Sequence, residues 1–425
     1  MKIAVNHLAR IEGHANLVID SVRGTVRELR LEIVEAPRFF EPMLTGRHYS
    51  DVAHIAARIC GICSNSHTLV SLQATEQALG IEVSEQTQSL RRLLAFGEIL
   101  QSHLVQLFFM ALPDYYGEAS ILPLVHTERA LVQHALELKK LANDILRVVG
   151  GRPVHPVTPV VGGFARLPEA ADLQELRRRL VRVLPDLEAS VEIFGSLDYP
   201  DFERDTDCFS LRGGDDYPLF GRQLVSSGGV DCAVEDYRDV LEEYLVPWST
   251  AKFARLQGRC FMVGPLARLR NNFDLLSPMA RQVAEALGLT PDTANPYRIL
   301  AARLVEVVHG VERAIHLIDE LLLAGLQAEE PLPPQRHGRA VAVIEAPRGL
   351  LFHSYSYDAQ GRIEQADCLI PTAQNLANIE ADLRARVPEL LETGREELTR
   401  QCEQLIRAYD PCISCSTHLL TIDFA

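Results

Sequence analysis

The spacing of hydrophobic and polar positions changes twice along the chain. Residues 2–36 alternate between apolar and polar positions and are interrupted by Gly13 and Gly24, which predicts antiparallel strands joined by tight turns. From about residue 66 to residue 325, apolar residues recur three or four positions apart, as they do on one face of a helix. This spacing predicts long helices over about 90–113, 125–149, 168–195 and 297–325.

The last part of the chain returns to strand spacing and then to helix spacing. Residues 339–370 alternate around a turn at 358–361, and helical spacing resumes over about 372–408. Between the long helices and these strands, the Pro- and Glu-rich stretch from Gln327 to Arg336 is the best candidate for a linker. The pattern predicts an α+β fold dominated by a long-helix bundle, with small antiparallel β segments near both ends.

Composition excludes several classes of protein. The chain has 425 residues, of which 47% are hydrophobic and 23% charged, so it has ample material for a buried core. Its 42 Lys and Arg against 57 Asp and Glu give a net charge of −15, which argues against nucleic acid or an anionic membrane as a partner. No apolar run approaches the roughly 18 residues of a membrane helix. We therefore expect no membrane span and no export signal in this chain.

Two of the cysteine groups have metal-ligand spacing. Cys60 and Cys63 form one C-x-x-C pair, and Cys412 and Cys415 form another near the opposite end of the chain. Each such turn directs two sulfurs to one point, so the two pairs together are able to close a four-thiolate site that joins the ends of the chain. Spacing alone leaves structural zinc, an iron–sulfur centre, nickel, or buried or redox-active thiols as alternatives.

Further motifs accompany these cysteines. In chain order, the whole set is Arg10-Ile11-Glu12-Gly13-His14, Arg38-Phe39-Phe40-Glu41 with Gly46-Arg47, Arg58-Ile59-Cys60-Gly61-Ile62-Cys63 with His67, Leu112-Pro113-Asp114, Gly151-Arg152-Pro153-Val154-His155-Pro156, Gly162-Gly163-Phe164, Glu345-Ala346-Pro347-Arg348-Gly349, Ile370-Pro371-Thr372, and Asp410-Pro411-Cys412-Ile413-Ser414-Cys415-Ser416-Thr417-His418. With these motifs, the chain resembles the large, catalytic subunit of [NiFe]-hydrogenases over nearly its full length. The resemblance implies the fold of that subunit and the reversible, heterolytic oxidation of dihydrogen to protons and electrons.

The resemblance also assigns the metal ligands. It implies that all four cysteines bind nickel, with Cys60 and Cys412 as terminal ligands and Cys63 and Cys415 bridging to an iron that carries carbon monoxide and cyanide. Soft thiolates suit both metals. Three further residues would bind this cofactor: Thr372 as a hydroxyl donor to a cyanide, Pro371 beside it, and His67 as a hydrogen-bond partner of the thiolate region.

Four charged residues receive catalytic roles from the same resemblance. Glu12 matches the first proton relay beyond the cysteine sulfur, a role that suits a carboxylate whose pKa is raised by burial. Arg348 matches an arginine held over the open metal position, and Asp114 and Asp410 match the carboxylates that orient it. Without the resemblance, Glu12 would be a surface residue paired with Arg10, and the two aspartates would be turn or cap residues.

A second metal site and a removable tail are implied near the C-terminus. Glu41 and His418 match the side chains of a magnesium or iron site, completed by a main-chain carbonyl from about Cys368. We expect one domain over 1–425, with a β-rich part over 1–65, a helical bundle over 66–325, an α/β part over 339–418 and a tail over 419–425. In the family, a maturation protease removes this tail after nickel-delivery factors have loaded the site. Other cysteines match no ligand motif: Cys208, Cys232, Cys260, Cys368 and Cys402.

The closest subgroup implied is the cytoplasmic, NAD(P)-linked or coenzyme-linked one. The segment Gln101-Ser102-His103-Leu104-Val105-Gln106 keeps a single histidine where longer, periplasmic members carry a His-rich run. Such an enzyme needs an iron–sulfur small subunit, and flavin-containing diaphorase subunits would pass the electrons to NAD(P). Two alternatives are a non-catalytic scaffold related to the quinone-site subunit of respiratory complex I and a zinc-stapled structural protein.

Overall fold

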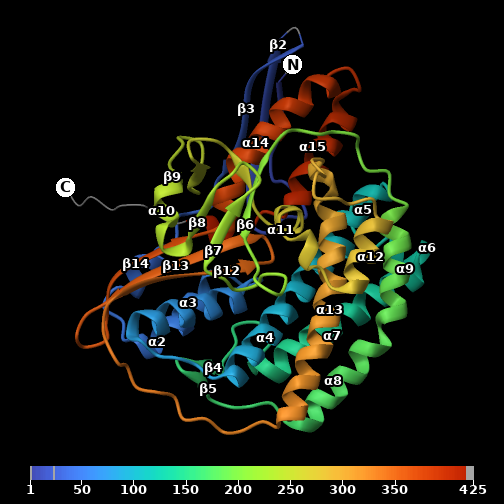
Figure 1. Ribbon diagram of the computed structural model, residues 1–425. Helices are drawn as coiled ribbons and strands as arrows, with labels where there is room; N and C mark the ends of the chain where they lie inside the picture. The colour runs from blue at the N-terminus through green and yellow to red at the C-terminus, as the bar shows by residue number, and fades with distance from the viewer. Residues whose placement is uncertain (1, 23, 418–425) are drawn as a thin grey trace, which may run out of the picture.

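Three antiparallel strands at the start of the chain form a small sheet at the top of Figure 1. The structure is a computed structural model, and it describes residues 2–22 and 24–417. The strands are β1 (Lys2–Val5), β2 (Ala15–Val22) and β3 (Thr25–Ile33), with β2 in the centre. Alternate apolar side chains such as Leu17, Leu29 and Leu31 are buried. The predicted β segment is confirmed.

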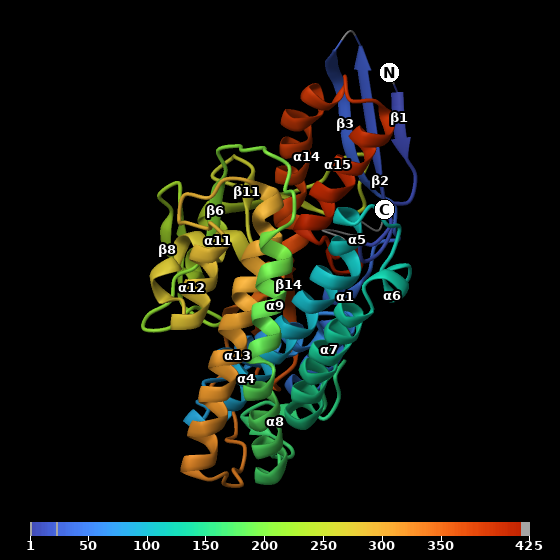
Figure 2. The same ribbon diagram turned by 90° about the vertical axis from the view of Figure 1, so that its right-hand side faces the viewer.

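Four long helices form the bundle that fills the lower half of Figure 2. They are α4 (Glu85–Leu104), α7 (Arg129–Gly150), α8 (Ala170–Arg182) and α13 (Ile299–Ala324). α13 packs against α4 and α8, and α4 also packs against α7. α7 ends where predicted, because Gly151 adopts the left-handed conformation of a helix cap, with φ +77°.

The stretch predicted as one helix over 168–195 is two helices. α8 ends at Arg182, and α9 (Leu184–Gly195) starts anew with Pro185 in its first turn, where the missing N–H of proline is tolerated. Other helices in this part of the chain are α1 (Phe40–Leu44), α2 (Tyr49–Ala56), α3 (Ser64–Leu79), α5 (Leu112–Tyr115), α6 (Leu124–Thr127) and α12 (Pro278–Ala286).

Within residues 2–22 and 24–417, one helical run is long and apolar enough to cross a membrane. α4 continues through a π-helical segment (Val105–Ala111) into α5, so that the run spans Glu85–Tyr115, with a mean hydropathy of 1.4 in its most apolar window. Of that window, 83% is buried inside the protein, against α13 and α7. Burial in the core of the fold therefore accounts for its apolar character, as it does for the central helix of a helical bundle.

A group of short strands interrupts the region that was expected to be helical. Within 66–325, β6 and its neighbours build a four-stranded sheet in the order β11-β6-β7-β8, and β9 and β10 form a hairpin. Each strand has two to five residues, too few for alternation to stand out in the sequence. The elements are β4 (Pro159–Val160), β5 (Gly163–Phe164), β6 (Asp207–Leu211), β7 (Gln223–Ser226), β8 (Asp231–Ala233), α10 (Tyr237–Val240), β9 (Leu241–Tyr244), β10 (Phe253–Leu256), β11 (Phe261–Met262) and α11 (Pro265–Asn271).

The C-terminal part is a three-stranded antiparallel sheet followed by helices, as predicted. The strands are β12 (Arg339–Ala346), β13 (Gly349–Tyr357) and β14 (Ile363–Leu369), and β12 and β13 pack on α3. The helical stretch predicted over 372–408 is two helices, α14 (Pro371–Leu390) and α15 (Arg395–Tyr409), separated by Gly394 at φ +94°. A single turn, α16 (Ile413–Ser416), follows.

The predicted linker is a strap fastened to the helices beneath it. Residues 325–338 contain no helix or strand. The Glu329 carboxylate accepts hydrogen bonds from Ser84 at 2.8 Å and Thr87 at 2.9 Å, and Gln327 exchanges two hydrogen bonds with Gln86. The strap thus joins α13 to β12 across the start of α4.

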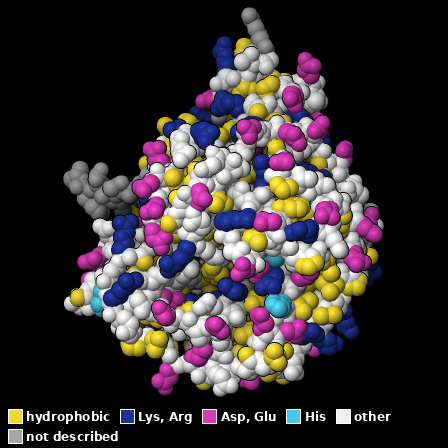
Figure 3. All heavy atoms as spheres, in the orientation of Figure 1, with side chains coloured by type: hydrophobic (Ala, Val, Ile, Leu, Met, Phe, Trp, Pro, Cys, Tyr) yellow, Lys and Arg dark blue, Asp and Glu magenta, His cyan; other side chains and the backbone are white. Residues whose placement is uncertain are grey.

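On the face in Figure 3, acidic and basic side chains are interspersed.

Candidate metal centre

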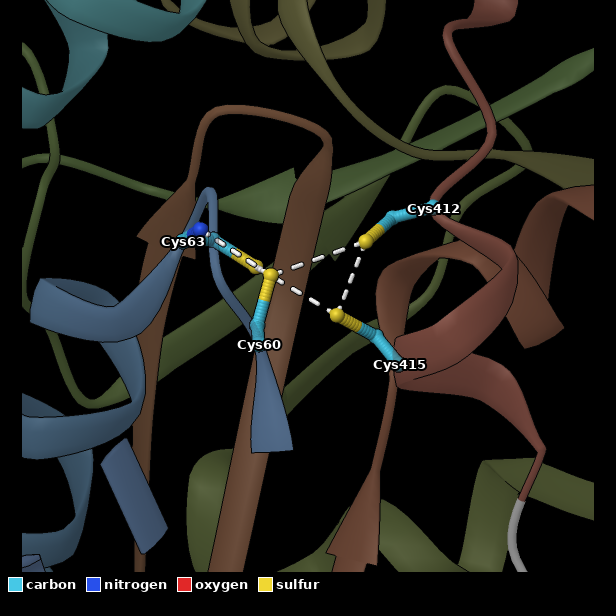
Figure 4. A group of neighbouring side chains, drawn as sticks. All are labelled: Cys60, Cys63, Cys412 and Cys415. Carbon is cyan, nitrogen blue, oxygen red and sulfur yellow. Dashed lines mark hydrogen bonds between the residues drawn. The ribbon is translucent and has the colours of Figure 1, made fainter. Parts of the chain in front are cut away.

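Four cysteine sulfurs meet at one buried point (Figure 4). Their Sγ atoms all lie within 4.8 Å of one another. Cys60 and Cys63 are 2.7 Å apart, Cys412 and Cys415 are 2.8 Å apart, and the pairs face each other at 3.6 Å and 3.5 Å. Among the described residues, this is the one group of three or more Cys, His, Asp or Glu side chains close enough to hold a metal ion.

The first pair lies in the tight turn that leads into α3. Cys60 follows a short 3-10 helix (Ala57–Ile59), and Cys63 is the N-cap of α3. The backbone N–H groups of Ile62 and Cys63 donate to the Cys60 sulfur at 3.2 Å and 3.0 Å. N–H donors stabilise a thiolate, because the partial positive charge of each hydrogen points at the negatively charged sulfur. The turn is therefore built for an ionised sulfur.

The second pair is held by contacts with distant parts of the chain. Cys412 is the N-cap of α16, and its backbone N–H donates to the Thr372 hydroxyl at 2.9 Å. Ile413 donates its N–H to the Glu12 carbonyl at 3.0 Å. A side chain at Gly13 would come within 2.6 Å of Ile413, so glycine is required at this close approach.

The pKa values of the four thiols separate into two classes. Burial raises the pKa of Cys60, but hydrogen bonds with the other thiols outweigh it and hold that pKa well below its usual value. A hydrogen bond with Cys415 lowers the pKa of Cys412. The pKa of Cys63 is raised by its hydrogen bond with Cys412, and burial raises that of Cys415. Cys60 and Cys412 are thus the more readily ionised thiols, and binding of a metal would displace the protons that remain on the sulfurs.

A small cavity adjoins the sulfurs on one side. It is lined by Cys63, Cys412, Cys415, Arg348, His67, Pro371 and Thr372, together with apolar side chains. The guanidinium of Arg348 is buried, and its positive charge interacts with the sulfurs of Cys412, Cys63 and Cys60. A set of four soft ligands with a neighbouring cation and a cavity on one side fits a thiolate-bound nickel–iron pair.

Arg348 has one carboxylate partner where two were predicted. Its Nε donates to the Asp410 carbonyl at 2.6 Å, and its Nη2 lies 2.9 Å from Asp410 Oδ2. Its Nη1 donates to the Ser102 hydroxyl at 3.4 Å. Asp114 does not contact Arg348, so the prediction for Asp114 is wrong in this respect. The side chain on the α4 side of the arginine is the neutral Ser102.

Asp114 serves a different purpose, because it lies beyond the π-helical segment and faces two other arginines. Both carboxylate oxygens accept from Arg407 Nη1, at 2.8 Å and 2.7 Å, and one also accepts from Arg10. Arg10 has a positive φ of 59° and precedes Glu12 by two positions, while Arg407 lies in the last turn of α15. Asp114 therefore fastens the segment that carries Glu12 to the helix that leads to Cys412.

Glu12 lies against the second cysteine pair. Its carboxylate accepts from the Ser414 N–H at 3.0 Å and from the Ser414 hydroxyl at 2.5 Å, and its backbone forms a parallel bridge with Cys412. Burial and the neighbouring Cys412 sulfur raise the pKa of Glu12 to about 7, although the Ser414 hydrogen bonds oppose the shift. A carboxyl with this pKa is populated in both proton states near neutral pH.

His67 lies in the first turn of α3 and lines the cavity. Its Nδ1 lies 3.1 Å from Nε2 of His353, whose Nδ1 is 2.5 Å from the Tyr355 hydroxyl. Pro371 and Thr372, which begin α14, line the same cavity. The three residues predicted to contact the cofactor thus surround one cavity.

The structure describes two of the three residues predicted for the second metal site. Glu41 Oε1 accepts from the Cys368 N–H at 3.1 Å and lies 3.6 Å from Lys252 Nζ, which is also 3.8 Å from Glu243. Because the N–H and C=O of a strand residue point to the same edge, the Cys368 carbonyl faces the Glu41 side. His418 lies outside the described residues.

Three structural features of the site had no role in the sequence prediction. Arg38 donates to the Ile59 carbonyl at 2.6 Å and to the Ser414 carbonyl at 3.2 Å, so it joins the two cysteine turns. Ser414 holds Glu12, and Ser102 holds Arg348. Arg38, Ser102 and Ser414 all lie inside sequence segments already singled out, which is the signal that could have found them.

Known hydrogenases are similar to this chain over nearly its whole length. The family model described as nickel-dependent hydrogenase matches residues 38–128 and 233–418. Sulfhydrogenase 1 subunit alpha of Pyrococcus furiosus is 36% identical, with 99% of each chain covered. The NAD-reducing hydrogenase HoxS subunit beta of Cupriavidus necator is 28% identical, over 99% of this chain and 95% of the relative.

A solved structure has the same fold. The crystal structure of an NAD+-reducing [NiFe]-hydrogenase in the H2-reduced state aligns with a TM-score of 0.88 and 29% identity, covering 98% of this chain and 99% of that one. The α+β fold dominated by long helices, predicted from the sequence, is therefore confirmed. The β lobe formed by β6–β11 adds to the β segments expected near the two ends.

Proposed function

The chain belongs to the nickel-dependent hydrogenase family, and we propose that its four buried sulfurs hold a nickel–iron centre at which dihydrogen is split reversibly into protons and electrons. The observation that carries this is a four-thiolate set that borders a cavity beneath a buried arginine. A structural zinc site, by contrast, is closed on all sides by its four ligands. The hydrogenase relatives along the full length do not favour the scaffold alternative or the zinc-stapled one.

The chain supplies the base for the proton half of dihydrogen. When bound, the nickel–iron pair would supply a soft, redox-active site for the cleavage of dihydrogen. Cys60 and Cys412 would hold the nickel and offer their sulfurs as bases, and Glu12 lies beside Cys412. We infer that the proton passes from the sulfur to the Glu12 carboxylate, whose pKa of about 7 allows it to take up and release a proton near neutral pH.

In this proposal, Arg348 polarises dihydrogen in the cavity and does not exchange a proton of its own. Burial works to lower the pKa of Arg348, but Asp410 and the cysteine sulfurs raise it well above its ordinary value. A guanidinium that stays charged cannot act as the base. It can direct N–H groups into the cavity, where low dielectric strengthens their effect.

Arg348→Lys is expected to lower turnover roughly 100- to 1,000-fold while nickel is retained, because one ammonium cannot reach both the Asp410 carbonyl and its carboxylate. The measurement is kcat for dihydrogen oxidation together with nickel per chain. Arg91→Lys is the matched control, since Arg91 forms a buried bidentate pair with Glu76, at 2.6 Å for both contacts. Equal turnover in Arg348→Lys and wild type would contradict the role.

Three residues support the proposal that the iron carries carbon monoxide and cyanide. The Thr372 hydroxyl accepts from the Cys412 N–H, so its own O–H hydrogen remains available as a donor. Thr372, Pro371 and His67 line the same cavity. We also propose that Glu41, the carbonyl of Cys368 and His418 hold magnesium or a second iron, as hard oxygen ligands suit such ions.

The chain needs partner subunits to carry electrons away. Among the described residues, the four sulfurs are the one metal-ligating cluster, so nothing else there provides an iron–sulfur relay. We propose an iron–sulfur small subunit and flavin-containing diaphorase subunits that reduce NAD(P), in the cytoplasm. The relatives named as subunits, one of them of an NAD-reducing enzyme, support this assembly.

We also propose that a maturation protease removes residues 419–425 after nickel delivery. Residues 418–425 lie outside the described residues, but Thr417 before them is buried and its carbonyl accepts from the Arg38 N–H at 2.6 Å. Intact mass of the active enzyme should end at His418, and a variant stopped there by a stop codon should be poorly matured. Nickel-loaded, fully active enzyme that retains Ala425 would contradict the proposal.

A further inference from the structure

The Asp410 carboxylate is shared by two buried arginines. Arg348 Nη2 lies 2.9 Å from Asp410 Oδ2, and Arg303 Nη1, from α13, lies 3.4 Å from the same oxygen. Arg303 Nη2 also donates to the Tyr409 carbonyl at 3.3 Å, and the Arg303 side chain is fully buried. Arg303 therefore contacts both the carboxylate that holds Arg348 and the backbone just before it.

The orientation of Arg303 is set by His103 of α4. His103 Nδ1 accepts from Arg303 Nη1 at 3.1 Å, and His103 Nε2 lies 2.7 Å from Glu306 Oε2. Burial lowers the pKa of His103 to about 3, so the imidazole is neutral. An arginine only donates and a carboxylate only accepts, so the neutral ring carries its proton on Nε2 and leaves Nδ1 as the acceptor. One tautomer satisfies both contacts.

The far end of this chain of contacts returns to the strand that carries Arg348. Glu306 accepts from Arg268 Nε and Nη2, both at 2.7 Å, and from the Tyr217 hydroxyl at 2.7 Å. Arg268, from α11, donates to the Ala346 carbonyl at 2.7 Å, at the end of β12 and two positions before Arg348. The buried contacts thus form a closed ring through Arg348, Asp410, Arg303, His103, Glu306, Arg268 and Ala346.

We propose that Arg303, oriented by His103, is a positioning residue for the hydrogenase reaction: it sets the place of the Asp410 carboxylate and, through it, of the Arg348 guanidinium beside the sulfurs. The inference rests on the proposed role of Arg348. Stability alone does not account for the arrangement, because buried ion pairs are often no more stabilising than apolar side chains of similar volume. Asp410 joins the two arginines through ion pairs, and the contacts from Arg303 through His103, Glu306 and Arg268 each have a defined donor and acceptor. Such a network fixes geometry.

The test is a double-mutant cycle on the metal-loaded enzyme with Arg303→Lys, Arg348→Lys and both together. Arg303→Lys is expected to lower kcat roughly 10- to 100-fold, as small displacements at a reacting centre do, with the KM for dihydrogen and nickel per chain close to wild type. The double variant should be as slow as Arg348→Lys and no slower, because Arg303 acts through Arg348. A crystal structure of Arg303→Lys should show the Asp410 carboxylate and Arg348 displaced.

Each other outcome has a defined meaning. Unchanged kcat in Arg303→Lys overturns the inference and leaves the proposed function intact, whereas unchanged kcat in Arg348→Lys overturns the proposed role of Arg348 itself. Losses that multiply in the double variant show a merely structural Arg303. The Arg91→Lys control, another buried arginine, should leave kcat unchanged.

A second pair of variants covers the case in which Arg303→Lys fails to load nickel. His103→Gln keeps a donor and an acceptor for Glu306 and Arg303, whereas His103→Leu removes both. His103→Leu is expected to lower kcat and His103→Gln to restore part of it, at equal nickel content. Equal activity of the two variants, or loss of nickel in Arg303→Lys and His103→Leu alike, overturns the inference.

Discussion

Replacement of Cys415 by serine is expected to leave the purified protein without nickel and without hydrogenase activity. The four sulfurs meet within 4.8 Å at a buried point, and each is needed to complete the ligand set. A serine hydroxyl is harder and far less acidic than a thiol, so it is a poor ligand for a soft metal. The same result is expected for Cys60→Ser, because Cys60 has the most strongly lowered pKa of the group. Nickel per chain is the primary measurement.

Cys208→Ser is the matched control for these variants. Cys208 is buried, but its sulfur lies 3.3 Å from Arg270 Nη1 and 3.7 Å from the Thr206 carbonyl, away from the four-sulfur site. A serine hydroxyl can make the same contacts, so nickel and turnover should stay at the wild-type level. Nickel retained in full by Cys415→Ser and Cys60→Ser would show that these sulfurs are not ligands.

Glu12→Gln is expected to lower turnover roughly 100- to 10,000-fold, the usual range for loss of a general acid–base group. The amide keeps the shape of the side chain and can still accept from Ser414, but it cannot take up a proton. Nickel content and the infrared bands of the proposed diatomic ligands should persist, because Glu12 does not bind the metals. The variant thus separates proton transfer from assembly of the site.

The control for Glu12 is Glu380→Gln. Glu380 is also partly buried, its pKa is raised by burial, and it accepts from a backbone N–H, that of Leu31 at 2.9 Å. Its other hydrogen-bond partner is Trp248 Nε1 at 3.1 Å, and neither partner is a cysteine. Glu380→Gln should keep wild-type turnover. If Glu12→Gln also does so, Glu12 is not the relay.

Local spacing predicted the elements that are long and regular. The β segment at 2–36, the sheet over 339–370 and the four long helices all have patterns that extend over many residues. The strands of the β lobe escaped because each is too short to show alternation. The break between α8 and α9 escaped because Pro185 is tolerated in a first helical turn and the apolar spacing runs on through it.

The sequence predicted the metal ligands, which lie in two short C-x-x-C motifs. It predicted less well which side chains contact Arg348, because those contacts depend on how distant elements pack. Two C-x-x-C turns already predict four converging sulfurs, and the structure brings them together. Which residue faces Arg348 depends on the π-helical segment between Ser102 and Asp114, whose wider turn shifts the helix phase. The resemblance of the Leu112-Pro113-Asp114 motif gave Asp114 the contact with Arg348, whereas in the structure Asp114 pairs with Arg10 and Arg407.

The buried ring around Asp410 is only partly predictable from the sequence. Arg303 and Glu306 are the charged members of an otherwise apolar run at the start of α13, and both are buried. Charged residues in such a run signal a paired interior network, because an unpaired buried charge is too costly. The partners themselves come from α4, α11 and the end of α15, and only the fold brings these elements together.

Elemental analysis of the purified chain, produced together with its maturation factors, tests the central claim most directly. The thiolate set, the cavity beneath Arg348 and the family all predict about one nickel per chain, with one or two irons and no stoichiometric zinc. Zinc near one per chain with nickel absent would contradict the nickel–iron assignment and leave the four cysteines as a structural zinc site.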